Sequence, residues 1–420
     1  MKFVAALSSV LFAATTSAQL ATGDVAVTGF SDSVFGVLQP NGAVTGYATP
    51  GFQGTGIATS QAILWDRANP QDFLVAGFGF VGRATILGPG TVAYSLITNN
   101  VGVVSQMSWL DAGLVVLIDS GTSQVRLLDL GSGTVSDLSS GPQPWGADAS
   151  AGAVDPRTGD VLVGGNGGIH RWPFGGGAAS TLVTGLGGYV TGIAFDPTNG
   201  DVLATVLTVN RVIRIDGSGT VSDVAPPFSV PGPNALVVDQ DGDLVTGGGT
   251  GQVYRIPRAG GTPVFLADNT SPPNAVNGLA VVGGGGFGVP FGQACNGVAG
   301  PATLSASGSY VVGATIQTTS TNHAANVPGV LVLGVSDSVY LGAPLPASLD
   351  AQLGTSGCSL WVSGDTLVAG ITAATSPASL DFGVLLQPII SGFRFYAQHV
   401  CLEPVPGGLS WSNGVEFYVP

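Results

Sequence analysis

The hydrophobic positions of this chain fall in short runs separated by turns rich in Asp and Gly, and this pattern repeats. Three apolar runs begin at Ala153, Ala194 and Ala235, so they lie 41 residues apart (194 − 153 and 235 − 194). Each leads through an Asp- and Gly-containing turn into a second apolar run, and two further runs complete the unit. Such a unit predicts a four-stranded antiparallel meander. A period in the forties with four strands per unit is typical of a propeller blade.

The same register extends to the earlier part of the chain and to both ends of the repeat region. A sixth unit is split between Asp24–Thr45, which aligns with residues 201–222 as strands two to four, and Asn277–Val282, which matches an innermost strand. We therefore predict an all-β fold with a six-bladed β-propeller over residues 22–288, in which N- and C-terminal strands close one blade and leave no open sheet edge; seven blades are the alternative. The five complete units begin near Ala62, Met107, Ala153, Gly192 and Asn234.

The periodicity stops after a run of four glycines at residues 283–286. From residue 290 to residue 420, short alternating runs broken by Gly and Pro predict a separate β-sandwich. The N-terminus has a different pattern: Lys2, an apolar run from Phe3 to Ala14, and small residues up to Ala18. These match the three regions of a secretory signal peptide. We expect cleavage of residues 1–18, no membrane span, and a protein that is secreted to an extracellular, periplasmic or cell-surface location.

The repeat motifs carry a resemblance to known propellers. The Ala-[Val/Phe]-Asp-Pro units at Ala153 and Ala194 and the Asn-Gly-Leu-Ala sequence at residues 277–280 resemble six-bladed propellers of the NHL, YncE-like and gluconolactonase (senescence-marker-protein) type. The gluconolactonase resemblance implies a divalent cation held by Glu, Asn and Asp oxygens. Asp148, Asn234 and Asn277 match the Asp and Asn parts, but no glutamate precedes Glu403, so the Glu ligand has no counterpart. We predict no cofactor, with calcium or another divalent cation as the alternative.

The C-terminal region carries a second resemblance. The sequence Phe-Gly-Gln-Ala-Cys ending at Cys295, with the segments around Cys358 and Trp411, resembles a module that recurs behind varied repeat domains in secreted bacterial proteins. This resemblance implies an accessory, attachment or sorting role.

The expected ligand site is the axial funnel of the propeller, where loops lead from the outer strand of one blade to the inner strand of the next. Convergent polar groups at such a mouth favour binding, and the alternative is that they cap the inner strands and satisfy backbone groups. In our register these loops supply Gln61, Gln106, Asp148, Tyr189, Asn234 and Asn277.

Composition excludes several functions. The formal net charge is −14, and Lys2 is the only lysine, so chemistry that needs a lysine is excluded once the signal is removed. An acidic chain without a basic patch argues against nucleic-acid binding. No Gly-x-Ser-x-Gly elbow accompanies a strand-to-helix pattern, which argues against a hydrolase triad.

Two further groups of residues have alternative interpretations. Asp239-Gln-Asp-Gly-Asp243 superficially resembles a calcium loop, but the paralogous units favour a hairpin turn in which Asp accepts local N–H bonds and Gly takes positive φ. The histidines are expected in a blade strand (His170), a sandwich loop (His323) and a sandwich strand (His399), and none has a metal-ligating partner at short spacing.

The three cysteines all lie in the last third of the chain, where an exported protein can oxidise them. We predict a disulfide between Cys295 and Cys358, because both lie in Gly-rich segments, whereas Cys401 follows an alternating strand. Pairing of Cys358 with Cys401 is the alternative.

These patterns predict a secreted, non-enzymatic propeller that presents a binding or interaction surface, with the sandwich as an accessory domain. We expect a monomer whose partner is a protein, a glycan or a small molecule. The alternative is a gluconolactonase-like hydrolase or lyase with a degenerate metal site.

Overall fold

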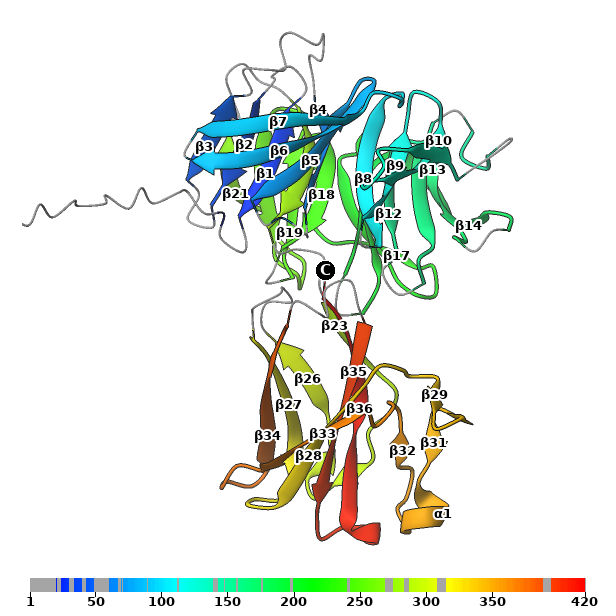
Figure 1. The fold of residues 1–420 in the computed structure, drawn as a ribbon, viewed down its shortest axis with the longest axis vertical. Coiled ribbons are helices and arrows are strands. Elements are labelled where there is room, and N and C mark those ends of the chain that lie inside the picture. Colours follow the sequence, from blue (N-terminus) through cyan, green and yellow to red (C-terminus); the bar gives the residue numbers. More distant parts are fainter. Residues whose placement is uncertain are drawn as a thin grey trace, which may run out of the picture.

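The computed structural model is built almost entirely from β-strands, in two groups along the chain (Figure 1). Strands up to β22 gather in the upper part of Figure 1, and the strands from β23 onward gather below them. The structure describes residues 20, 24–29, 34–39, 43–48, 60–66, 69, 71–88, 90–111, 113–138, 143–146, 148–155, 158–174, 177–196, 199–239, 242–268, 275–282, 287–307, 315–387 and 394–419. The predicted signal peptide and the glycine run at 283–286 lie outside these residues.

The upper group contains four sheets built from antiparallel meanders; in the first sheet β22 lies beside β1, and a parallel bridge joins β3 to β7. The first, with the order β22–β1–β2–β3–β7–β6–β5–β4, contains β1 (Val25–Gly29), β2 (Val34–Leu38), β3 (Val44–Ala48), β4 (Ser60–Trp65), β5 (Asp72–Gly77), β6 (Phe80–Gly88), β7 (Thr91–Thr98) and β22 (Val276–Val281). The second contains β8 (Val104–Asp111), β9 (Leu114–Asp119), β10 (Gln124–Asp129) and β11 (Val135–Asp137). The third contains β12 (Ala151–Val154), β13 (Val161–Trp172), β14 (Ser180–Phe195), β15 (Val202–Val206), β16 (Arg211–Ile215) and β17 (Val221–Asp223). The fourth contains β18 (Pro233–Val238), β19 (Leu244–Gly248), β20 (Gln252–Ile256) and β21 (Val264–Asp268).

The predicted pairing between the two ends of the repeat region is confirmed. Strand β22 pairs antiparallel with β1, with Val281 opposite Val25 and Leu279 opposite Val27. Because β1 continues into β2 and β3, a late strand completes a meander that begins near the N-terminus.

Two long strands each serve two neighbours. β13 pairs with β12 through residues 161–164 and with β14 mainly through residues 168–171. β14 pairs with β13 through its first part and with β15 through residues 190–195. The second part of β14 is therefore the first strand of the next unit, in agreement with the unit start predicted near Gly192.

The first strands of successive units contact one another in a closed ring, and buried apolar side chains fill the space between neighbouring meanders. One cluster joins Leu74 and Val81 to Met107 and Trp109, and another joins Leu203 to Leu236 and Leu244. The core thus lies between meanders, with their first strands innermost. The contacts of the ring run from β22 to β4, β8, β12, β14, β18 and back to β22.

The lower group has two principal sheets that share one hydrophobic cluster. The sheet β23–β36–β35–β28–β33 contains β23 (Phe287–Phe291), β28 (Pro328–Gly334), β33 (Thr366–Ile371), β35 (Arg394–Leu402) and β36 (Leu409–Tyr418), and the sheet β26–β27–β34 contains β26 (Leu304–Ser307), β27 (Thr315–His323) and β34 (Ala378–Leu385). The shared cluster includes Ile316 and Leu380 from the smaller sheet and Val415 and Phe417 from the larger. Two-residue pairs are β24 (Asn296–Gly297) with β25 (Gly300–Pro301), β29 (Val339–Tyr340) with β30 (Ala343–Pro344), and β31 (Ala347–Ser348) with β32 (Ser359–Leu360).

Helical structure is minor in the residues that the structure describes. It consists of α1 (Asp350–Leu353) and a 3-10 turn at Pro406–Gly408. Within the described parts of the chain, no helix has the length and apolar character needed to cross a membrane. The predicted disulfide is present: Cys295 and Cys358 are joined, whereas Cys401 is a buried free thiol.

Candidate functional site

Five of the six first strands of the ring, all but β12, share an irregularity where they begin. The pairing register shifts by a residue around Gln61 in β4, Ser105 in β8, Thr191 in β14 and Asn277 in β22, and a shift also occurs between Pro233 and Leu236 in β18. A bulge of this kind turns a side chain away from the direction that regular alternation would give it, and bulges are frequent beside functional sites. The ring therefore carries a set of redirected, mostly polar side chains at the starts of its first strands.

Several of these polar side chains link the start of one first strand to the start of the next. Each donates a hydrogen bond to a backbone carbonyl at the beginning of the following first strand. The starts of the first strands therefore lie at one end of the ring. The bonds are Ser150 Oγ to Val190 O (2.7 Å), Thr191 Oγ1 to Pro233 O (3.0 Å) and Asn234 Nδ2 to Val276 O (3.0 Å).

The printed links run from β12 through β14 and β18 to β22, and no such link continues from β22 to β4 among the described residues. The Asn277 Oδ1 atom accepts a hydrogen bond from Asn234 Nδ2 at 2.8 Å, but Asn277 Nδ2 is buried and has no partner. The Gln61 Nε2 atom on the adjacent strand β4 is buried without a partner as well. These statements hold for the described part of the chain. An unsatisfied buried donor costs about 1–3 kcal/mol, so two of them on neighbouring strands mark a place where the described residues leave hydrogen-bonding capacity unused.

The other glutamine of the predicted set is fully used within the fold. Gln106 Nε2 donates to Ile193 O at 3.1 Å, and its Oε1 accepts from Gly152 N at 2.9 Å. Gln106 thus ties β8 to β12 and β14. The Gln106 side chain therefore satisfies backbone groups of the fold, which was the alternative to a ligand-binding role.

Two of the three metal candidates are in contact. Asn234 and Asn277 touch, but through an amide N–H to oxygen hydrogen bond that uses one of the two oxygens. Asp148 is half-buried, and its carboxylate has no hydrogen-bond partner in the described residues. The register adds Ser105, Ser150 and Thr191 to the predicted residues near the starts of the first strands.

Exposed aromatic side chains lie beside the starts of the first strands. Tyr189 is 41% exposed and directly precedes Val190, the acceptor of the Ser150 hydrogen bond. Phe78 is 50% exposed and forms a bridge with Val103, which directly precedes β8.

A third aromatic side chain belongs to the same end of the ring. Phe228 is 70% exposed, and its N–H donates to Asn210 O at 2.9 Å. The Asn210 side chain in turn accepts from the N–H of Gly232, which directly precedes β18 (2.6 Å). We call this end of the ring the start face. It consists of the polar side chains at the starts of the first strands and the three aromatic side chains beside them: Gln61, Ser105, Ser150, Thr191, Asn234 and Asn277, with Phe78, Tyr189 and Phe228.

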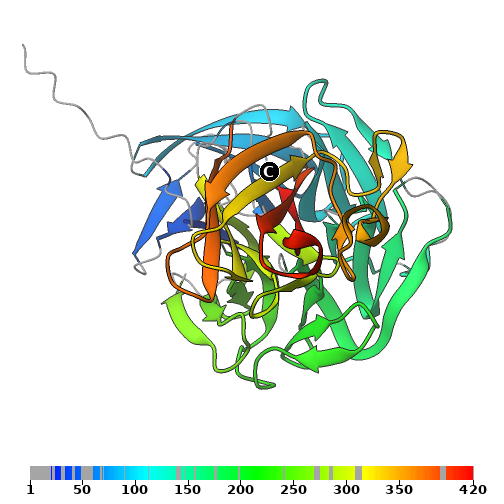
Figure 2. The same ribbon diagram turned by 90° about the horizontal axis from the view of Figure 1, so that it is seen from below.

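The start face lies at the end of the ring away from the C-terminal strands. Four residues separate Val282, just after β22, from Phe287 at the start of β23, and the five residue-to-residue steps span at most about 18 Å. The far end of β22 therefore faces the lower group of strands, whose sheets lie across the ring in the view from below (Figure 2). The start of β22, with Asn277, points the other way.

The Asp-containing turns are hairpins, as the sequence predicted, and they carry a second repeated feature. Asp239 accepts a hydrogen bond from the Asp243 N–H within the turn, Asp243 accepts one from the more distant Arg258 N–H, and Gly242 has a φ of 83°. A buried Asp in each turn also pairs with an Arg from the third strand of the unit, so these residues stabilise the repeat. The pairs are Asp66 with Arg83 (2.9 Å), Asp155 with Arg171 (3.2 Å), Asp196 with Arg214 (2.9 Å) and Asp239 with Arg255 (3.0 Å).

Two of the three histidines belong to a buried hydrogen-bond network that the sequence did not reveal. His170 lies in β13, and burial lowers its pKa. His323 is not in a loop: it is the last residue of β27, fully buried, and its Nδ1 contacts the Glu403 carboxylate. His323 Nε2 lies 2.7 Å from Ser320 Oγ, which lies 2.8 Å from His399 Nδ1. Sequence spacing could not reveal this network, because Glu403 is 80 residues from His323.

Burial and hydrogen bonding shift the pKa of three groups in or beside this network. Burial alone would raise the pKa of Glu403, but hydrogen bonds from His323 and Ser410, the charge of His323 and a bond from the Val298 N–H lower it on balance. Burial, and to a smaller extent the charge of His323, lowers the pKa of His399 to about 3, so this imidazole is neutral. Burial, followed by the charge of Glu403, raises the pKa of Cys401 to about 12.

Comparison with known proteins establishes the fold and goes no further. Neither protein-family models nor curated protein sequences yield a match. A solved structure, the crystal structure of a nidogen/laminin complex, matches with a TM-score of 0.51 and 11% sequence identity, over 61% of this chain and 98% of that one. An identity this low carries no information about ligands. The match and the all-β sheets together show that this chain has a β-propeller fold.

Proposed function

We propose that this chain is an exported, non-enzymatic six-bladed β-propeller that presents a binding surface, with a β-sandwich as an accessory domain. The propeller covers residues 22–288, the sandwich covers residues 290–420, and residues 1–18 are the export signal. The closed ring of first strands supports the six blades, and the hydrophobic cluster shared by the two lower sheets supports the sandwich. The Cys295–Cys358 disulfide agrees with an oxidising location. The protein acts as a monomer in this proposal.

The observation that carries the proposal is the composition of the start face. Two buried amide donors, Gln61 Nε2 and Asn277 Nδ2, have no partner among the described residues, and three exposed aromatic side chains lie around the same end of the ring. Aromatic side chains are enriched where proteins bind partners, since they bury a large apolar area with few rotatable bonds. Acceptor oxygens from a partner would satisfy the amide donors. A protein segment or a glycan offers both an apolar face and acceptor oxygens.

The charge and chemistry of the start face favour binding over catalysis. Its redirected side chains are amides and hydroxyls, which donate and accept hydrogen bonds but do not titrate near neutral pH. The formal charge of −14 disfavours an anionic partner, so we propose a partner of low charge. The structural neighbour comes from a protein complex, and this agrees with a propeller used as an interaction surface.

One experiment separates this function from a gluconolactonase-like one. Full-length mature protein is assayed for lactone hydrolysis with and without added divalent cations, and the same protein is screened against glycan and peptide arrays. We expect array ligands that a Phe78→Ala/Phe228→Ala variant loses, and no turnover. Metal-dependent turnover that Asp148→Ala abolishes would contradict the proposal and support the enzyme.

A matched control comes from the outer strand of a blade, away from the first strands. Phe265 is 53% exposed, as Phe78 is exposed, but it lies on the outer strand β21. Phe265→Ala removes the same kind of side chain without changing the start face. Ligands retained by Phe265→Ala and lost by the Phe78/Phe228 variant are therefore bound at the start face.

A further inference from the structure

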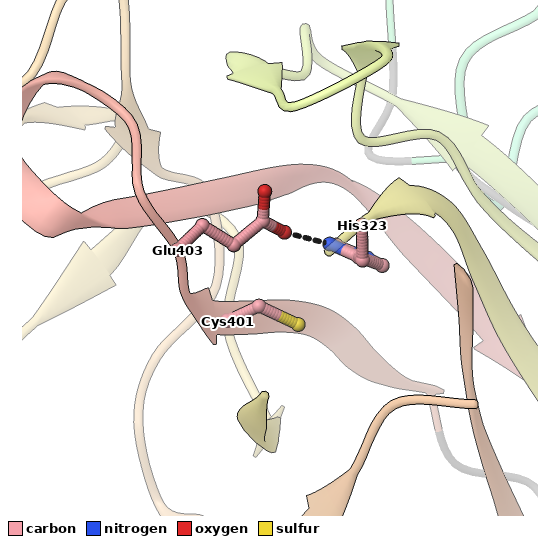
Figure 3. Close-up of side chains that lie close together, drawn as sticks. All are labelled: His323, Cys401 and Glu403. Atoms are coloured by element: carbon pink, nitrogen blue, oxygen red, sulfur yellow. Dashed lines mark hydrogen bonds and ion pairs between the residues drawn. The ribbon is translucent and has the colours of Figure 1, made fainter. Parts of the chain in front are cut away.

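We propose that His323, Cys401 and Glu403 bind one zinc ion in the interior of the C-terminal sheets. His323 ends β27 in the smaller sheet, Cys401 lies in β35 of the larger sheet, and Glu403 follows directly after β35 ends. One ligand atom from each residue lies within 4.8 Å of the other two, and Figure 3 shows the three side chains gathered around the His323–Glu403 contact. The ion would join the two sheets across their shared core.

The donor atoms match the chemistry of zinc. An imidazole nitrogen, a thiolate sulfur and a carboxylate oxygen are the ligand types that zinc takes, at about 2.0–2.3 Å and in tetrahedral geometry. Calcium and magnesium prefer an all-oxygen set, which this site does not supply. The Ser410 Oγ atom lies 2.8 Å from Glu403 Oε1 and 3.3 Å from His323 Nδ1, so a polar group also lines the remaining side of the site.

The charges at the site sum to zero when zinc is bound. One zinc ion carries two positive charges, and the Cys401 thiolate and the Glu403 carboxylate each carry one negative charge. His323 and Cys401 are fully buried and Glu403 is 5% exposed, so a net charge there would be costly. Coordination requires the Cys401 thiol to lose its proton to solvent and His323 to hold its ring proton on Nε2, which leaves Nδ1 free to bind the ion.

The surrounding hydrogen bonds already orient the ligands. A metal-binding histidine usually donates its other ring N–H to a neighbouring acceptor, which fixes the tautomer and the ring plane. The His323 Nε2 atom lies 2.7 Å from Ser320 Oγ, and the Ser320 hydroxyl can donate a hydrogen bond to His399 Nδ1 at 2.8 Å. The second carboxylate oxygen of Glu403 accepts from the Val298 N–H at 3.1 Å. Both ligands therefore have partners that do not compete with the metal.

Binding requires a small rearrangement. Donor atoms around a tetrahedral zinc ion lie roughly 3.3–3.7 Å apart, given the ligand distances above. The direct contact between His323 Nδ1 and Glu403 Oε1 must open by about 1 Å, and atoms near the 4.8 Å limit must close by about 1 Å. Side-chain rotation on rigid strands can supply displacements of this size.

Cobalt substitution tests the site in the full mature chain. The protein is treated with EDTA, dialysed and titrated with Co²⁺. We expect one equivalent to give the intense visible absorption of a tetrahedral site together with a thiolate-to-cobalt charge-transfer band, and Zn²⁺ to displace both. Because Cys295 and Cys358 form a disulfide, a thiolate band from this chain can come only from Cys401.

Two variants sharpen the result. Cys401→Ser should remove the charge-transfer band and weaken cobalt binding at least tenfold, whereas His170→Gln, which changes a histidine in β13, should leave both unchanged. If folded wild-type protein gives no thiolate band and no rise in melting temperature with Zn²⁺, the proposal is wrong. A band that persists in Cys401→Ser would also overturn it. If Cys401→Ser does not fold, the wild-type spectrum alone decides.

Discussion

Two glutamines on neighbouring first strands give a sharp test of the start face, because the structure treats them differently. Gln61 has a buried amide nitrogen without a partner in the described residues, whereas Gln106 donates to Ile193 O and accepts from Gly152 N. Gln106→Leu leaves those two backbone groups without this partner, at about 1–3 kcal/mol each, so we expect a loss of about 2–6 kcal/mol. Gln61→Leu removes an unsatisfied donor, so stability should be unchanged or should rise by up to about 2 kcal/mol.

The assay is urea unfolding of both variants and the wild type, followed by tryptophan fluorescence, with the midpoint and slope fitted together. A total stability of about 5–15 kcal/mol makes the expected loss for Gln106→Leu easy to measure. The reasoning is refuted if Gln61→Leu destabilises the protein as much as Gln106→Leu does. In that case the Gln61 amide has a partner within the fold, and the start face has no donor left for a ligand.

Three further outcomes follow from the structure. Arg214→Ala should lower stability by about 2–4 kcal/mol, because it removes the ion pair to the buried Asp196, whereas Arg211→Ala, which removes a more exposed pair with Asp223, should cost about 0–1 kcal/mol; equal losses in urea unfolding would contradict this. Hydrogen bonds from the Gly357 N–H, the Thr355 hydroxyl and the Cys358 N–H lower the pKa of Asp350, so its stabilisation is present above the unfolded-state pKa of about 3.9 and is lost as pH falls through the lower folded-state value. The melting temperature of Asp350→Asn should therefore lie below that of the wild type at about pH 7 and approach it at about pH 2, and calorimetry that finds a constant difference would count against it. A chain that ends at Pro273 lacks β22 and its buried Val276, Leu279 and Val281, so it should aggregate in size-exclusion chromatography, whereas a chain that ends at Phe287 should elute as a folded monomer; identical profiles would mean that the ring closes elsewhere.

The sequence predicted those features that local pattern and repetition determine. The apolar runs and Asp–Gly turns placed the units, and the match between Asn277–Val282 and other first strands predicted the pairing of β22 with β1. The register shifts at the starts of the first strands, such as the one at Thr191, were not predicted. A bulge reverses which side a residue faces, and periodicity alone cannot locate it.

Other features depend on contacts between distant parts of the chain. The Asp–Arg pairs could not be predicted without the register between the turn and the third strand, although the Asp and the Arg each recur visibly in the repeats. The network of His323, Glu403 and His399 joins strands of two sheets, and no short spacing in the sequence marks it. The disulfide was predicted because its cysteines lie in Gly-rich segments that can approach one another.

The most direct test of the start face is calorimetric titration of an array-derived ligand into wild-type protein, Phe228→Ala and Phe265→Ala. Both side chains are large and exposed, at 70% and 53%, but only Phe228 lies beside the start of a first strand. Truncating a central aromatic contact costs about 2 kcal/mol or more, so we predict that Phe228→Ala weakens binding at least tenfold while Phe265→Ala binds as the wild type does. Equal affinity of Phe228→Ala and the wild type, or loss of binding in Phe265→Ala, would contradict the assignment of the ligand to the start face.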